Sequence, residues 1–137
     1  MKLNNNIVKR LMYLSGIVNI GGVLIFSRFF SNPAINEADP VVMSNFGLVM
    51  ICVWGLVFLA TASKWNQLKW AIGAFAIEKL IYGLVWTNWL MNNDLSSVYD
   101  EDTMAGIFYT IYGVNDSFFF VFYSIVFVSL SRSRSKA

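Results

Sequence analysis

Residues 71–90 read AIGAFAIEKLIYGLVWTNWL, an apolar run with Glu78 and Lys79 side by side near its middle. A helix rises 1.5 Å per residue, so about 20 residues cross the hydrocarbon core of a bilayer, which is about 30 Å thick. A charge held at that depth costs about 3 kcal/mol on insertion scales. The stretch therefore predicts a membrane helix whose two charges meet partners on other helices.

Three other segments of the 137-residue chain are as long and as apolar. Without water, their backbone groups must pair within each segment, which a helix achieves. Barrel strands are shorter and alternate strictly, and SFFFVFYSIVFV does not alternate. We predict an all-α integral membrane protein, an antiparallel four-transmembrane-helix bundle forming one domain, with helices at about 11–30, 41–63, 70–91 and 104–130.

Composition supports lipid as part of the surroundings. The chain is 57% hydrophobic and only 13% charged, whereas about a quarter of the residues of a soluble domain are charged. Too few polar side chains remain to cover a water-facing surface. Its partner is therefore expected to be the lipid bilayer.

Metal and cofactor chemistry has few candidate ligands. Histidine is absent and Cys52 is the single cysteine, which removes the usual haem and zinc ligands and any internal disulfide. We expect no metal and no cofactor, and we expect Cys52 to pack as a small hydrophobic residue.

Charged residues divide between the two ends of the predicted bundle. Basic residues precede the first segment, separate the second from the third, and follow the fourth: Lys2, Lys9, Arg10, Lys64, Lys69, Arg132, Arg134 and Lys136. The other two connections are acidic, with Arg28 as their one nearby base: Glu37, Asp39, Asp94, Asp100, Glu101 and Asp102. The Lys/Arg bias predicts both termini in the cytoplasm, in the inner (plasma) membrane of a bacterium. Basic tails suit lipid headgroups rather than nucleic acid.

Helix ends and the fate of the first segment can also be predicted. Asp39 is expected to cap the second helix with Pro40 in its first turn. Asp100, Glu101 and Asp102 are expected at the start of the fourth, where the helix dipole favours negative charge. The first segment is long for a signal and has no A-x-A site, so we expect it to be retained.

Polar side chains recur at one depth in three of the predicted helices. Glu78 lies about 12 Å past Trp70, Asp116 about 20 Å past Thr103, and Asn19 about 12 Å past Leu11. Such costly groups should face one another inside the bundle, with one carboxylate paired to the ammonium and the other holding a proton near neutral pH. The predicted polar core is Asn19, Glu78, Lys79, Asn115 and Asp116.

Aromatic residues recur at three- and four-residue spacing around this core, hence on its helix faces. An acidic centre walled by rings suits an organic cation or a flat apolar ligand. In the first helix, Ser15, Asn19 and Gly22 form a small polar stripe that would permit close approach of a neighbour. The predicted wall is Phe75, Tyr82, Trp86, Tyr109, Tyr112, Phe119 and Tyr123.

Three functions remain open at this point. The polar core binds or transports a small amphipathic, cationic or lipid-like molecule, and transport with only four helices needs a homodimer. Alternatively, the network locks the helices together in an accessory subunit of a larger membrane complex. In a third hypothesis a carboxylate is the general acid of an intramembrane isomerase or cyclase. An enzyme is the less favoured of these, because no motif defines a reaction.

Two families share parts of this architecture. The size and four spans are similar to the small multidrug-resistance transporters, which carry an essential acid in the first helix, where this chain has Asn19. The acidic, aromatic pocket is similar to that of sterol-isomerase-type membrane proteins. Neither resemblance assigns a role to a residue, because fold-level likeness does not carry function.

Overall fold

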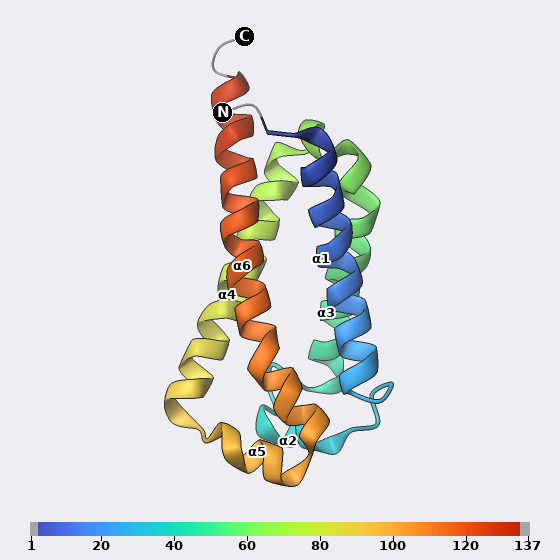
Figure 1. The fold of residues 1–137 in the computed structure, drawn as a ribbon, viewed down its shortest axis with the longest axis vertical. Coiled ribbons are helices and arrows are strands. Elements are labelled where there is room, and N and C mark those ends of the chain that lie inside the picture. The colour runs from blue at the N-terminus through green and yellow to red at the C-terminus, as the bar shows by residue number, and fades with distance from the viewer. Residues whose placement is uncertain (1–2, 135–137) are drawn as a thin grey trace.

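The computed structural model describes residues 3–134, and these are helical with no β-strand among them (Figure 1). Lys2, Lys136 and the side chain of Arg134, which contributed to the predicted orientation, lie outside the described part. The elements in chain order are α1 (Asn5–Phe26), α2 (Pro33–Ala38), α3 (Asn45–Thr61), the 3₁₀ helix η1 (Ala62–Gln67), α4 (Lys69–Asn92), α5 (Leu95–Glu101) and α6 (Thr103–Arg134).

The long helices pack as two pairs, α1 with α3 and α4 with α6, and α1 also contacts α6 (Figure 1). The N-terminus, the C-terminus and η1 lie at one end of the molecule, and α2 and α5 lie at the other. Among the described residues, Lys9, Arg10, Lys64, Lys69 and Arg132 therefore lie towards the first end, and the acidic connections lie at the second. This is the separation of charge that the sequence predicts.

Three helices within residues 3–134 are long and apolar enough to cross a membrane: Asn5–Phe26, Asn45–Gln67 and Thr103–Arg132. The predicted third span, 70–91, is also a helix, because α4 runs from Lys69 to Asn92. It is not among the three, since Glu78 and Lys79 lie in its middle and lower its mean hydropathy. Length alone does not separate α4 from the others.

The first helix is displaced from its predicted range of 11–30. It begins at Asn5, because the Asn4 side chain accepts hydrogen bonds from the backbone N–H groups of Asn6 and Ile7. It ends at Phe26, because residues 28–30 all have positive φ, between 49° and 65°. Left-handed backbone is unfavourable for residues with a Cβ atom, so this turn ends a helix that its apolar sequence alone would continue.

The predicted cap at Asp39 is wrong, and the predicted acidic start of the fourth helix is correct for Asp102 but wrong for Asp100 and Glu101. Asp39 accepts hydrogen bonds from the N–H groups of Val41 and Val42 in a turn, and Ser44 caps α3 instead. Asp100 and Glu101 belong to the last turn of α5. In both connections a short additional helix, α2 or α5, occupies chain that was expected to be loop. Asp102 does precede α6, and its carboxylate accepts from the N–H of Ala105.

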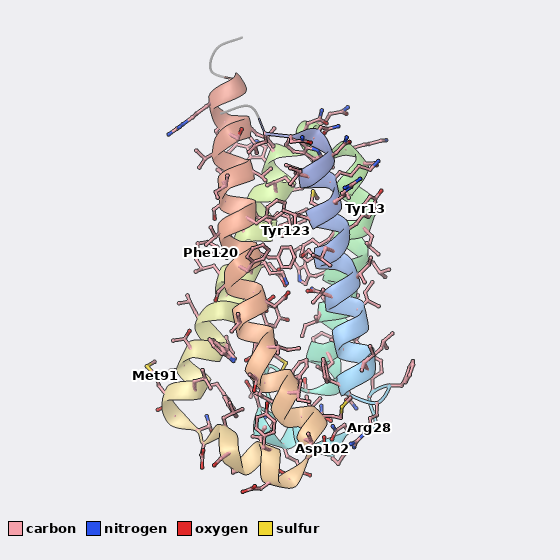
Figure 2. All side chains as sticks on the ribbon, in the orientation of Figure 1. Tyr13, Arg28, Met91, Asp102, Phe120 and Tyr123 are labelled. Carbon is pink, nitrogen blue, oxygen red and sulfur yellow. The ribbon has the colours of Figure 1, made fainter. Side chains whose placement is uncertain are left out.

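The interior consists of two apolar clusters stacked along the helix axes. The cluster nearer the termini includes Met12, Phe58, Phe75 and Tyr123, and the Tyr123 ring points inward from α6 (Figure 2). The cluster nearer α2 and α5 consists of Val23, Ala34, Ile35, Met43, Leu48, Trp89, Val98, Ala105, Phe108, Tyr109 and Tyr112. Buried polar residues of α1, α4 and α6 lie between the two clusters.

The helices α1 and α3 approach each other closely at two glycines. A Cβ atom added to Gly16 would lie 2.7 Å from the carbonyl oxygen of Gly55. Of the predicted stripe of Ser15, Asn19 and Gly22, Asn19 lies at this approach, because a Cβ atom added to Gly55 would lie 3.1 Å from the Asn19 Cβ. Gly22 does not, because a Cβ atom there meets nothing within 4 Å. Gly22 faces open space, and the helices touch one and a half turns earlier.

Candidate functional site

Lys79 lies at the centre of a buried polar layer formed by the predicted polar core, Asn19, Glu78, Lys79, Asn115 and Asp116. Its side chain is 1% exposed, and its ammonium donates to Asp116 Oδ1 at 2.7 Å and to Asn19 Oδ1 at 3.0 Å. The ammonium also lies 5.2 Å from the centroid of the Phe58 ring. One α4 side chain thus contacts α1, α3 and α6 together, instead of extending toward an interface.

Glu78 lies beside Lys79 with weaker contacts. Its residue is 6% exposed, and neither carboxyl oxygen accepts a hydrogen bond from the described residues. The nearest cation is the Lys79 ammonium, 3.6 Å from Oε2. The Tyr82 and Tyr123 side chains are close enough to interact electrostatically with Glu78. Glu78 is therefore a buried acid with unused hydrogen-bonding capacity.

Two asparagines hold the stronger ion pair in place. Asn19 donates from Nδ2 to the carbonyl oxygen of Ile51 in α3, at 3.3 Å, which orients its Oδ1 toward Lys79. Asn115 donates from Nδ2 to Asp116 Oδ1 at 3.2 Å. The structure therefore brings together all five residues of the predicted polar core, from three helices.

The charges of this layer do not balance when every group is ionised. Two carboxylates and one ammonium sum to −1, and all three residues are at most 6% exposed. A buried net charge costs several kcal/mol, whereas a paired set costs far less. The layer is therefore suited to hold one additional positive charge, either a proton or a cation.

A crevice between α1 and α6 leads to this layer. Its volume is about 60 Å³, and it is partly open. Such a volume accommodates about four water-sized groups, whereas drug-sized ligands occupy pockets of about 300–1,000 Å³. Its lining is Val18, Asn19, Gly22, Val23, Phe26, Ile51, Phe108, Ile111, Tyr112, Asn115 and Asp116.

The predicted aromatic wall divides between the two apolar clusters. Phe75, Phe119 and Tyr123 belong to the cluster nearer the termini, where the Phe75 and Tyr123 ring centroids are 5.5 Å apart. The other four belong to, or pack against, the second cluster: Tyr82, Trp86, Tyr109 and Tyr112. Most of these rings contact one another, and only Tyr112 also lines the crevice.

Two aromatic residues of the crevice were missed from the sequence. Phe26 and Phe108 line it together with Tyr112. The spacing of Phe108, Ile111, Tyr112 and Asn115 is that of one helix face, so the α6 side was recognisable. Phe26 follows Ser15, Asn19 and Gly22 at the same three- and four-residue spacing, so the α1 side was recognisable as well.

A separate polar cluster ties α1 to α6 at the acidic end of the molecule (Figure 2). Asp102 accepts from Arg28 Nη2 at 2.7 Å and from Asn32 Nδ2 at 2.9 Å. The backbone N–H of Ala105 and then the Asn32 and Arg28 side chains, which outweigh partial burial, hold the pKa of the Asp102 carboxyl below its usual range. This cluster, called the clamp below, lies near the end of α1, where Asn32 Nδ2 also donates to the carbonyl oxygen of Phe26 at 3.2 Å.

Within residues 3–134, no group of three or more histidine, cysteine, aspartate or glutamate side chains is placed to hold a metal ion. A scan against models of protein families finds no match to the chain, and searches of curated proteins and of solved structures find none either. Fold and site define the class: a helical protein with three helices able to cross a membrane and a buried polar layer.

Proposed function

We propose that this chain is a four-span membrane protein that binds a slim, single-chain amphiphile, whose polar head reaches Asp116 through the crevice between α1 and α6. Both termini lie in the cytoplasm, in the inner membrane of a bacterium, because lysine and arginine gather at their end of the molecule. The crevice is the observation that carries the ligand proposal.

The exposed surface of α4 supports a fourth span. Its two central charges are buried, so they do not face lipid. Its outward face is as apolar as those of the other long helices, and its exposed large side chains are Trp70, Ile77, Leu80, Ile81, Leu84 and Met91. A helix with charged residues on its buried side and apolar residues on its exposed side can cross a membrane, because polar residues inside membranes face the protein interior.

The chemistry of the crevice supports an amphiphile. Its sides are apolar and its inner end carries Asn19, Asn115 and Asp116. The Tyr112 hydroxyl has no hydrogen-bond partner among the described residues, and a bound hydroxyl or ammonium head would supply one. An opening between α1 and α6 admits molecules dissolved in the bilayer. The size excludes a bulky ligand and selects a small head with the first few carbons of one narrow chain, the rest of which extends out of the crevice.

The test uses a substitution that fills the crevice and leaves the residues of the polar layer unchanged. Native mass spectrometry of the purified protein is recorded with 1-octanol or octylammonium, which carry the same chain and different heads. We expect Gly22→Leu to abolish bound amphiphile, because Gly22 lines the crevice and has free space at its Cβ. Gly21→Leu is the matched control, with equal free space outside the crevice, and it should retain binding.

The result that overturns the proposal is equal amphiphile binding by the parent protein and Gly22→Leu, or no binding by either. The same spectra report whether the protein is a homodimer, which transport through this site requires.

A structural role for the layer is the second candidate, and the completeness of the Lys79 contacts favours it. Its ammonium joins three helices, which is sufficient to lock a bundle together. In that case the protein acts as an accessory subunit of a membrane complex. A pulldown in mild detergent then returns a stable partner, and Gly22→Leu, which leaves the layer intact, has no effect on its recovery.

A further inference from the structure

We propose that the polar layer exchanges a proton for an organic cation, so that a primary alkylammonium bound at Asp116 displaces one proton from Glu78. This inference rests on the proposed amphiphile site and names the ligand's charge class. It follows from the position of Lys79 between two buried carboxylates and from the requirement that the layer stay neutral.

The Lys79 ammonium has two anionic partners within reach. It is 2.7 Å from Asp116 Oδ1 and 3.6 Å from Glu78 Oε2. A shift of about 1 Å converts the longer contact into a charge-assisted hydrogen bond. The lysine side chain is flexible enough to make that shift by rotation, so the backbone of α4 need not move.

In the resting state the proton belongs to Glu78. Asp116 already accepts hydrogen bonds from Lys79 and Asn115, which favour its ionised form, whereas Glu78 accepts none among the described residues. With Glu78 neutral, the layer consists of one carboxylate and one ammonium, and its charge is zero. The titratable and charged side chains that face it are Lys79 and Tyr82 from α4 and Tyr112, Asp116 and Tyr123 from α6; α1 contributes Asn19, and α3 the Phe58 ring.

Cation binding reverses the pairing. An ammonium head enters the crevice beside the rings of Phe26, Phe108 and Tyr112, whose faces attract cations, and pairs with Asp116. Lys79 then turns to Glu78, the O–H bond of the Glu78 carboxyl breaks, and the proton leaves to water. The layer now holds two ammonium groups and two carboxylates, so its charge is again zero.

The proton count tests this exchange. Isothermal titration calorimetry of octylammonium is performed in two buffers that differ in ionisation enthalpy, between about pH 6 and pH 8, where a primary amine stays protonated. We expect about one proton released per octylammonium bound at the acid end of this range, where the affinity should rise by up to about tenfold per pH unit, and less release as Glu78 becomes ionised in the free protein. 1-Octanol, which brings no charge, should bind with no proton release and no pH dependence.

A variant identifies the group that releases the proton. Glu78→Gln mimics the neutral acid and cannot lose a proton, so octylammonium binding should weaken at least tenfold and become independent of pH. 1-Octanol binding should persist in Glu78→Gln, which verifies the fold. Glu37→Gln, which removes an exposed carboxylate, is the matched control and should behave as the parent protein does.

The outcomes separate the two proposals. If octylammonium and 1-octanol bind in the crevice with equal affinity and no proton is released, the exchange is refuted and the amphiphile site stands. Proton release that survives Glu78→Gln also refutes the exchange. If neither molecule binds, the site itself is refuted.

Discussion

The two faces of α1 are packed in opposite ways within a stretch of about 9 Å along the helix. Toward α3, Gly16 brings the backbones together so closely that an added Cβ atom would lie 2.7 Å from the Gly55 carbonyl oxygen. Toward α6, Gly22 borders a crevice of about 60 Å³. Glycine therefore serves two purposes on one helix, a tight contact on one face and an open space on the other.

Asn19 lies between these two faces and joins them. Its Nδ2 donates to the Ile51 carbonyl oxygen on the closed side, and its Oδ1 accepts from Lys79 at the inner end of the open side. The contact of Asn19 with α3 thereby fixes the position of the Lys79 ammonium, which lies beside the crevice between α1 and α6. A rigid contact beside a cavity is what a binding site requires, because preorganised groups lose less entropy on binding.

Removing the ammonium should have the largest effect on both faces. We expect Lys79→Met to lower the free energy of unfolding by about 3–5 kcal/mol, because it leaves a buried carboxylate without its counter-ion. The measurement is denaturant unfolding in detergent, followed by circular dichroism.

The control for this change is the double variant Lys79→Met with Asp116→Asn. It removes both charges of the 2.7 Å pair and should recover most of the lost stability. If the two single losses simply add, the residues are not coupled, and the interpretation of Lys79 as the centre of the layer is wrong.

A single methyl group added at Gly16 should disrupt the tight contact between α1 and α3. Gly16→Ala should cost about 1–3 kcal/mol, because the new Cβ meets backbone and the Leu59 side chain. Gly21→Ala adds the same methyl to the same helix where nothing lies within 4 Å. It should be neutral or stabilising by up to about 1 kcal/mol, since alanine is the better helix former. Similar thermal stability of the two variants would contradict the difference between the faces.

The polar core could be predicted from sequence because the physical constraint is strong. Charged groups in long apolar segments must meet partners, so the depths of Asn19, Glu78 and Asp116 were sufficient to bring them together. The helices themselves followed from length and apolar content. The early start of α1 and the short helices α2 and α5 could not be predicted in the same way. They depend on local helix caps, and single residues such as Asn4 and Asn32 provide them.

The crevice could not be predicted, because it depends on rotation of each helix about its axis. Apolar residues surround every long helix, so sequence periodicity does not distinguish the faces that contact protein from those that face lipid. Gly16 and Gly22 are chemically identical, and only the arrangement of α3 and α6 around α1 makes one a contact and the other an opening.

Filling the open face should stabilise the protein slightly. We expect Gly22→Leu to raise the free energy of unfolding by about 1 kcal/mol, chiefly from helix propensity, while it fills the proposed amphiphile site. This combination of higher stability and lost binding sharpens the contrast with Gly16→Ala. A destabilised Gly22→Leu would mean that the crevice is already closed in the folded protein.

The smallest effect is expected at the clamp, where Arg28 and Asn32 after the end of α1 donate to Asp102 before the start of α6. Asp102 has a lowered pKa from its hydrogen bonds, so its contribution to stability is complete above about pH 4, the usual aspartate range, and is lost as the pH falls through the lowered value. Asp102→Asn keeps a capping side chain and removes the charge that pairs with Arg28. Since Arg28 is half exposed, we expect a loss of about 0.5–1 kcal/mol at pH 7. The difference in melting temperature between the parent protein and this variant should vanish on acidification. If the difference stays constant down to about pH 2, the lost stability does not come from the charge of the Asp102 carboxylate.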